Sequence, residues 1–162
     1  MSEIIKVGMA DMKVCNAPDG LTTLGLGSCI GAVIYDPVSK VSGMVHVMLP
    51  DSKAIKENSN KAKFADTGIE ELLDMVIKAG ADRKKLVAKI AGGAQMFAFS
   101  GGTNEFNKIG ERNAKAVKEM LGGYNIPILA EETGGNIGRT IIFDSVTGDL
   151  TIKAVGKPVK VV

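Results

Sequence analysis

Residues 29–35 and 41–49 are apolar segments that flank the short polar sequence Asp-Pro-Val-Ser at residues 36–39. Proline at the second position of such a four-residue sequence favours a tight turn. Two apolar segments joined by a tight turn are typical of a β-hairpin. The chain is therefore expected to contain an antiparallel pair of strands, to which its other elements are added.

The register of this hairpin brings two reactive residues together. With Pro37 and Val38 as the central residues of the turn, Cys29 on one strand lies opposite His46 on the other. Directly opposed residues project from the same face, with Cβ atoms ~4.5–5.5 Å apart, and a one-residue bulge would make them diagonal neighbours on that face. The other face carries the side chains expected to form a core, namely Ile30, Ala32, Ile34, Val41 and Val45.

Other parts of the chain add helices and further strands to the hairpin. Apolar residues at helical spacing follow a capping box at Thr67 and Glu70, and this helix is expected to end at Gly80. A second helix is expected over residues 111–121, with Gly122 as its stop. Short strands are expected at residues 4–7, 21–24, 86–91 and 126–130, and a second hairpin at residues 140–143 and 150–154.

The order strands, helix, strand, helix, strands predicts an α/β fold. Hairpins need antiparallel strands, whereas a strand–helix–strand crossover joins parallel ones. A chain with both is expected to form a layered sandwich of mixed β-sheets with flanking helices. Its 162 residues, 45% of them hydrophobic, are expected to form a single domain over residues 1–162. Residues 53–63 and 99–108 are expected to be exposed loops.

Charge and hydropathy argue against two classes of partner. The chain has 20 basic and 18 acidic residues, a formal net charge of +2, which gives no electrostatic basis for binding nucleic acid. No segment approaches the ~18 consecutive apolar residues of a membrane helix, and the first residues lack the apolar stretch of a signal peptide. We therefore expect a cytoplasmic protein without direct membrane insertion, in which Cys15 and Cys29 are free thiols.

A cysteine beside a histidine can act as a nucleophile. A free thiol has a pKa of ~8.5, so it is largely protonated at neutral pH and needs help to react. His46, the only histidine of the chain, is the candidate base. Its protonated ring within ~4–6 Å would favour the Cys29 thiolate, and the ring can later return the proton to a departing amine.

The residues around Cys29 supply the other parts that such a reaction needs. Gly25, Gly27 and Ser28 have unencumbered backbone N–H groups that are candidates for an oxyanion hole. A hydroxyl from either Thr22 or Thr23 is a candidate to orient the ring of His46, as Asp or Asn does in other cysteine–histidine enzymes.

Neither a cofactor nor a metal is expected. The glycines of residues 25–31 lack the spacing of a dinucleotide-binding loop, and the chain has no phosphate-binding Gly-Lys-Ser/Thr sequence. One histidine and two separated cysteines do not favour a zinc site. A purely structural interpretation stays open from these residues alone. Free cysteine is most often a small buried residue, and His46 alternates with Met44 and Met48 as a core residue would.

Seven sequence blocks together resemble the CheD family of bacterial chemoreceptor glutamine deamidases. They occur in the family's order and extend over nearly the whole chain. The blocks are residues 23–29 (TLGLGSC), 36–38 (DPV), 46–52 (HVMLPDS), 64–67 (FADT), 89–94 (KIAGGA), 109–113 (IGERN) and 132–136 (ETGGN).

This resemblance implies hydrolysis of selected glutamine side chains on chemoreceptors, which gives glutamate and ammonia during chemotaxis adaptation. It implies Cys29 as the nucleophile, His46 as the catalytic histidine and Thr23 as the residue that orients it. It also implies a fold similar to the catalytic domain of cytotoxic necrotizing factor. The implied partners are the cytoplasmic domain of a chemoreceptor and the CheC phosphatase, with the chain a monomer by itself.

Two alternatives accompany the resemblance. In the first, the chain is mainly a non-catalytic regulatory partner of the CheC phosphatase. In the second, the acyl-enzyme also serves transglutaminase or methylesterase chemistry. The sequence departs from the family pattern at residues 97–108, which are longer than expected. That departure concerns docking of a substrate or partner, since the residues assigned to the chemistry lie elsewhere.

Overall fold

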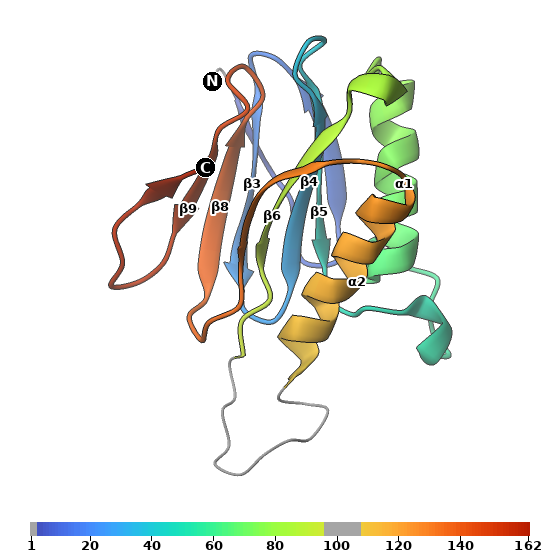
Figure 1. Ribbon diagram of the computed structural model, residues 1–162, viewed down its shortest axis with the longest axis vertical. Helices are drawn as coiled ribbons and strands as arrows, with labels where there is room; N and C mark the ends of the chain where they lie inside the picture. The colour runs from blue at the N-terminus through green and yellow to red at the C-terminus, as the bar shows by residue number, and fades with distance from the viewer. Residues whose placement is uncertain (1–2, 96–107) are drawn as a thin grey trace.

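The computed structural model describes residues 3–95 and 108–162, and these residues form three layers. Figure 1 shows two β-sheets face to face, with helices α1 (Ala65–Lys78) and α2 (Ile109–Gly123) on the outer face of one sheet. We call the uncovered sheet the first sheet and the helix-covered sheet the second sheet. The layered arrangement that the sequence predicted is confirmed.

Each sheet has five strands. The first sheet has the order β1 (Ile4–Lys6), β3 (Gly20–Leu26), β8 (Arg139–Asp144), β9 (Leu150–Lys153) and β10 (Lys160–Val161). The second has the order β2 (Met12–Asn16), β5 (Val41–Val47), β4 (Ile30–Asp36), β6 (Val87–Gly92) and β7 (Ile128–Thr133). One pair in each sheet is parallel, β1 with β3 and β6 with β7, and the other pairs are antiparallel. Both sheets are therefore mixed, as expected from a chain with hairpins and crossovers.

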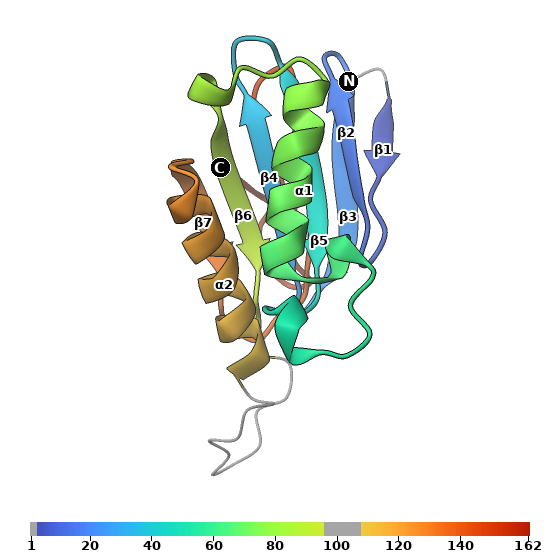
Figure 2. The same cartoon turned by 90° about the vertical axis from the view of Figure 1, so that its right-hand side faces the viewer.

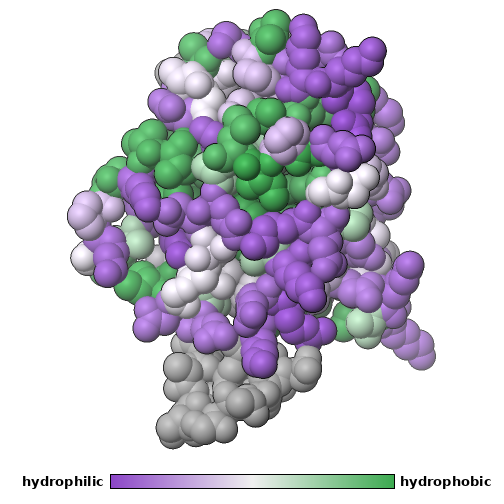
Figure 3. All heavy atoms as spheres, in the orientation of Figure 1, coloured by the Kyte–Doolittle hydropathy of each residue, from purple (hydrophilic) through white to green (hydrophobic). Residues whose placement is uncertain are grey.

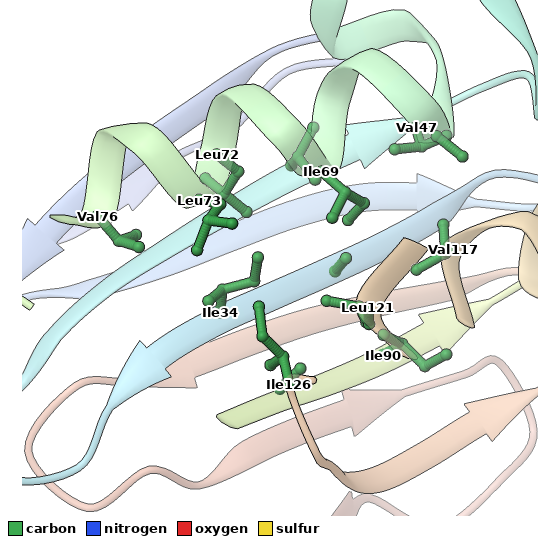
Figure 4. Close-up of a cluster of buried hydrophobic side chains, with 14 of the residues drawn as sticks. Ile34, Val47, Ile69, Leu72, Leu73, Val76, Ile90, Val117, Leu121 and Ile126 are labelled. Carbon is green, nitrogen blue, oxygen red and sulfur yellow. The ribbon is translucent and has the colours of Figure 1, made fainter. Parts of the chain in front are cut away.

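The helices and the second sheet enclose one hydrophobic core. Figure 2 shows α1 and α2 side by side in front of that sheet, and Figure 4 shows their apolar side chains meeting those of the strands. Burying such side chains is the main favourable contribution to folding. The five hairpin residues predicted to form a core all belong to this cluster, namely Ile30, Ala32, Ile34, Val41 and Val45.

A second hydrophobic cluster fills the space between the two sheets. Leu21, Phe143 and Ile152 project into it from the first sheet, and Val33 and Met44 from the second. Strand residues alternate between faces, so β4 and β5 send odd and even residues to different clusters. A residue of β5 that is two positions from Met44 therefore also has its side chain between the sheets.

The first helix starts differently from the prediction. Its N-cap is Phe64, without a side-chain cap, and Thr67 lies inside the first turn with its hydroxyl donating to Lys61 O at 2.7 Å. The predicted capping box at Thr67 and Glu70 is therefore wrong, because that hydroxyl is used by the preceding 3-10 turn. The predicted end at Gly80 is confirmed by its left-handed φ of +117°, which favours glycine.

The hairpin that the sequence predicted is present, but with a longer turn. Asp36 pairs with Val41, so the loop has four residues, and the β4–β5 register pairs Gly31 with His46. The prediction that Cys29 lies directly opposite His46 is therefore wrong. The cause is the carboxylate of Asp36, which accepts backbone N–H groups of the loop and also the N–H of Asp82, at 2.9 Å. Burial by itself would raise the pKa of this carboxyl, but these bonds outweigh burial and lower the pKa to about 2.

Some segments were not predicted, and others only in part. Neither β2 nor β10 was expected. Residues 53–63 are largely exposed, as expected, but they contain two short 3-10 turns. The predicted loop over residues 99–108 lies outside the described residues except for its last residue. Within the two described ranges, no helix has the length and apolar character to cross a membrane.

Candidate active site

Thr23 and His46 meet across the space between the two sheets. Thr23 lies on β3 of the first sheet, and its Oγ1 is 2.7 Å from Nδ1 of His46 on β5 of the second sheet. Both side chains are fully buried. The neighbouring Thr22 instead donates its hydroxyl to Ile141 O at 2.8 Å. Of the two threonines that the sequence left open, only Thr23 contacts the histidine.

The bonds of Thr23 determine which nitrogen of His46 carries a proton. The hydroxyl has one hydrogen, and it is donated to Val7 O at 2.8 Å, since a carbonyl can only accept. Oγ1 must then accept a hydrogen from Nδ1 of His46. In the neutral ring this leaves Nε2 with a lone pair, and Nε2 has no hydrogen-bond partner among the described residues. The ring is thus held as a base with its basic nitrogen available.

Glycine at position 31 leaves space between the sheets next to this contact. Gly31 is the register partner of His46, and an added Cβ there would lie 2.6 Å from Ile141 Cδ1 and 3.4 Å from Thr23 Cγ2. A distance below 3.0 Å forces a shift in the neighbouring atoms. Glycine at residue 31 therefore leaves room for the side chain of Ile141 beside the Thr23–His46 contact.

Cys29 lies on the same side of the second sheet as His46. It directly precedes β4 and packs in the inter-sheet cluster, to which Met44, on the same face of β5 as His46, also belongs. Because Gly31 is opposite His46, Cys29 is its diagonal neighbour, an arrangement with Cβ atoms within ~7–8 Å. Among the described residues no hydrogen bond joins the sulfur to the ring. Cys29 as a whole is 9% exposed, so a small part of this residue reaches the surface.

A pair of glycines supports the backbone of Cys29. Gly93 N donates to Cys29 O at 2.8 Å, and Ala94 N donates to Gly27 O at 2.8 Å. A Cβ on Gly92 would lie 2.2 Å from Cys29 O, and its φ of +114° also requires glycine. The end of β6 thus holds the turn that presents the thiol, at the lower end of the molecule in Figure 1.

Two clefts flank this turn. Gly25 lines one together with residues of the β7–β8 connection such as Asn136 and Ile137. Gly93 lines the other, and Asn136 lies on its wall as well. Neither cleft is lined by Cys29 itself. Figure 3 shows that the face in view is mainly hydrophilic towards this lower end, whereas hydrophobic surface gathers in the upper half.

Burial sets the resting protonation state of the candidate pair. Desolvation raises the pKa of the Cys29 thiol above its ordinary 9.0, against a smaller opposite effect of its own backbone N–H. Desolvation also lowers the pKa of His46 below its ordinary 6.5. Both directions favour a neutral thiol beside a neutral imidazole in the resting structure over the expected pair of thiolate and imidazolium.

The protonation state of His46 can be measured directly, because the chain has one histidine. In ¹⁵N-histidine-labelled protein at pH 7, NMR is expected to show a neutral ring with hydrogen on Nδ1, and titration is expected to give a pKa below 6.5. Because the pKa of His46 is lower in the folded than in the unfolded protein, the unfolded protein binds the proton more readily. The free energy of unfolding should therefore be highest above pH 6.5 and decline as the pH falls from 6.5 through the lower, folded pKa. In His46→Gln this decline should be smaller. A hydrogen on Nε2, or a pKa above 6.5, would contradict this structure.

The predicted oxyanion residues differ in what they can offer. Gly27 N donates to Gly25 O at 3.0 Å, so the Gly27 N–H is used within the turn, and its predicted role as a free donor is wrong. Gly25 has a φ of +68°, which shapes the turn. The N–H groups of Ser28 and Cys29 have no backbone partner among the described residues. The Ser28 amide is thus a predicted donor that is still free of a backbone partner, and the Cys29 amide is a candidate that the sequence analysis did not name.

Two residues at the site were missed from the sequence. The backbone carbonyl of Val7 accepts the hydroxyl hydrogen of Thr23, and no sequence pattern predicts this bond. Asn113 of α2 is fully buried and donates to Ser28 O and Met48 O. The sequence does indicate that Asn113 is buried, because it lies at helical spacing from Val117 and Leu121, which are also buried. In residues 3–95 and 108–162, no group of three or more His, Cys, Asp or Glu side chains could hold a metal ion.

Comparisons with known proteins agree on one family. The model of the family described as "CheD chemotactic sensory transduction" matches residues 48–154. A protein of Lachnoclostridium phytofermentans named probable chemoreceptor glutamine deamidase CheD is 64% identical over 160 residues, 99% of each chain. One of Caldanaerobacter subterraneus with the same name is 57% identical, over 98% of each chain. The chemoreceptor glutamine deamidase CheD of Halalkalibacterium halodurans is 51% identical, over 96% of each chain. The chain described above therefore belongs to the CheD family.

Proposed function

We propose that this protein is a chemoreceptor glutamine deamidase that hydrolyses glutamine side chains through a thioester on Cys29. The relatives named above carry this activity in their names, and they match this chain over nearly its full length. One CheD-like deamidase domain over residues 1–162 would then carry the reaction. Cys29 is the proposed nucleophile, His46 the proposed acid and base, and Thr23 the residue that orients His46.

The observation that carries the proposal is the hydrogen-bond chain from Val7 O through Thr23 to His46. A histidine that only fills a core has no need of a fixed tautomer with an unpaired nitrogen. An unpaired buried nitrogen is destabilising, by roughly 1–3 kcal/mol. Such a nitrogen on the face shared with Cys29 suits a base that accepts the thiol proton when substrate is present.

The proposed reaction balances without a cofactor or metal. As the Cys29 sulfur attacks the glutamine carboxamide carbon, Nε2 of His46 takes the thiol proton, and amide N–H groups stabilise the oxyanion. The imidazolium gives this proton to the leaving nitrogen, which departs as ammonia and leaves a thioester. Water then attacks the thioester while His46 accepts its proton. Collapse of the second intermediate yields glutamate and the free thiol.

The direction of the proton transfer follows from burial. Because burial disfavours both the thiolate and the imidazolium, a separate ion pair is not the starting state of the proposed reaction. Proton transfer and attack on the carbon are then coupled. The proposed enzyme needs neutral His46, so its kcat/KM should stay high as the pH is lowered towards 6.5 and fall only below it.

Further parts of the proposal concern partners and location. The cytoplasmic domain of a chemoreceptor is the proposed substrate, and the CheC phosphatase is a proposed partner. We also propose that the chain is a monomer by itself and acts in the cytoplasm. These parts rest on the family resemblance and on the names of the relatives.

The proposal is tested with a purified receptor cytoplasmic fragment. After incubation with the protein, mass spectrometry of receptor peptides should show conversion of selected glutamines to glutamate, with ammonia released in equal amount. Added primary amine distinguishes the chemistries, because a transglutaminase would attach it to the same glutamines. Unchanged glutamines at every position, with folded protein, would contradict the proposed function.

A further inference from the structure

Asn113 joins the two segments that carry Cys29 and His46. Its Nδ2 donates to Ser28 O at 3.0 Å and to Met48 O at 2.9 Å. Ser28 directly precedes Cys29, and Met48 follows His46 by two residues. Both partners are carbonyl oxygens, so the amide nitrogen, and not Oδ1, must face them. One neutral side chain with two N–H donors thus connects both segments to α2.

These two bonds begin where the β4–β5 ladder ends. The last ladder pair is Ile30 with Val47, and the same register would place Cys29 beside Met48. Among the described residues, no β4–β5 ladder bond beyond this pair connects the segment that carries Cys29 to the strand that carries His46. The amide of Asn113 replaces those bonds from the side of α2.

The bond to Ser28 also orients the amide of Cys29. The peptide bond between them is trans, since the cis bond of the described chain is Ala17–Pro18. In a trans peptide the C=O and the next N–H point in opposite directions. With Ser28 O held towards Asn113, the N–H of Cys29 points away from α2. Asn113 therefore sets the direction of an amide that is a candidate for binding the oxyanion.

Asn113 satisfies the carbonyls of Ser28 and Met48, yet it is a polar residue on the buried face of α2. Oδ1 of Asn113 is buried and has no partner among the described residues. An unpaired buried acceptor is destabilising, and the neighbouring core positions of the helix face, Val117 and Leu121, are apolar. A polar residue kept in this setting is better explained by the geometry it imposes on its two carbonyl partners.

We propose that Asn113 is a positioning residue that holds Cys29 and its amide in register with His46. This inference rests on the proposed function, because the reaction it serves is the proposed deamidation. Misplacing a reacting group by about 1 Å can lower a rate ~100-fold, so loss of Asn113 should act on the reaction step more than on binding.

The test compares the folded wild-type protein with Asn113→Leu, which keeps the branched shape and loses both donors, and with Asn113→Ser, which offers one hydroxyl donor on a shorter side chain. For deamidation of the receptor fragment, kcat should fall by about 10- to 100-fold in Asn113→Leu, while KM changes by no more than about twofold. Asn113→Ser should give an intermediate kcat, and it carries the test if the leucine variant does not fold. A wild-type kcat in a folded Asn113 variant would overturn the proposal.

A matched control separates positioning from general destabilisation. Asp36→Asn weakens the buried cap at the opposite end of β4 and should lower the melting temperature, yet leave kcat unchanged. An equal loss of kcat at equal destabilisation in Asp36→Asn would show that Asn113 has only a structural role.

A second measurement does not need deamidation. In a Cys15→Ala background, the pH profile of Cys29 alkylation by iodoacetamide should show an inflection from His46 below pH 6.5, and Asn113→Leu should lose it. An unchanged inflection would overturn the positioning role. If the wild-type protein does not deamidate the receptor but the inflection is lost in Asn113→Leu, the proposed function fails while the positioning of Cys29 stands.

Discussion

Replacing Cys29 by alanine should abolish conversion of receptor glutamines to glutamate, with a loss on the order of a million-fold in kcat. The proposed thioester cannot form without the sulfur, and no other described side chain lies at the same place to replace it. Mass spectrometry of receptor peptides after prolonged incubation measures the loss. Because Cys29 is small and packs at the edge of the inter-sheet cluster, Cys29→Ala should fold normally.

The second cysteine supplies the matched control. Cys15 is also buried, but it lies on the edge strand β2, where its sulfur is 3.5 Å from Ser42 Oγ. Ser42 is on β5, four residues and about 13 Å along the strand from His46. Cys15→Ala should therefore keep full activity. Activity retained in Cys29→Ala, or lost in Cys15→Ala with the fold intact, would refute the assignment of the nucleophile.

Replacing His46 should have the second-largest effect. His46→Gln keeps a polar side chain at this fully buried position but cannot accept and return the proton, so kcat should fall by about 10²- to 10⁴-fold. Thr23→Val keeps the imidazole and the shape of the threonine but removes the acceptor for Nδ1–H. Its kcat should fall less, on the order of 10- to 100-fold.

Kinetics at several pH values, with melting temperatures for each variant, distinguish a catalytic histidine from a structural one. In the wild-type protein the acid limb of kcat/KM should lie below pH 6.5, and His46→Gln should lack it. A His46→Gln variant that is folded and retains more than about a tenth of the wild-type kcat would contradict a role in proton transfer.

The parts of the fold that follow from local sequence could be predicted. Apolar alternation in the hairpin and helical spacing after Thr67 depend on residues close in the chain, and both elements are present. The register of the hairpin could not be predicted, because Asp36 caps the distant N–H of Asp82 as well as its own loop. The start of the first helix was misplaced for a similar reason, since the hydroxyl of Thr67 bonds outside the helix.

The candidate site also has parts that the sequence could predict and parts that it could not. Cys29 and His46 stand out in the sequence because a free thiol and a sole histidine belong to the two halves of one predicted hairpin. The choice of Thr23 over Thr22 depends on which face of β3 meets the other sheet. The contribution of Asn113 depends on two carbonyls 85 and 65 residues away in the chain, so it becomes visible only when α2 is placed against the second sheet.

The most direct measurement is capture of the acyl-enzyme. The protein is mixed with the receptor fragment, quenched in acid within the first turnover and digested, and peptides are read by mass spectrometry. A receptor glutamine side chain linked to the sulfur of Cys29, and released by hydroxylamine, is the predicted result. Ongoing conversion of glutamine to glutamate without any adduct on Cys29, or with the adduct on another residue, would contradict it.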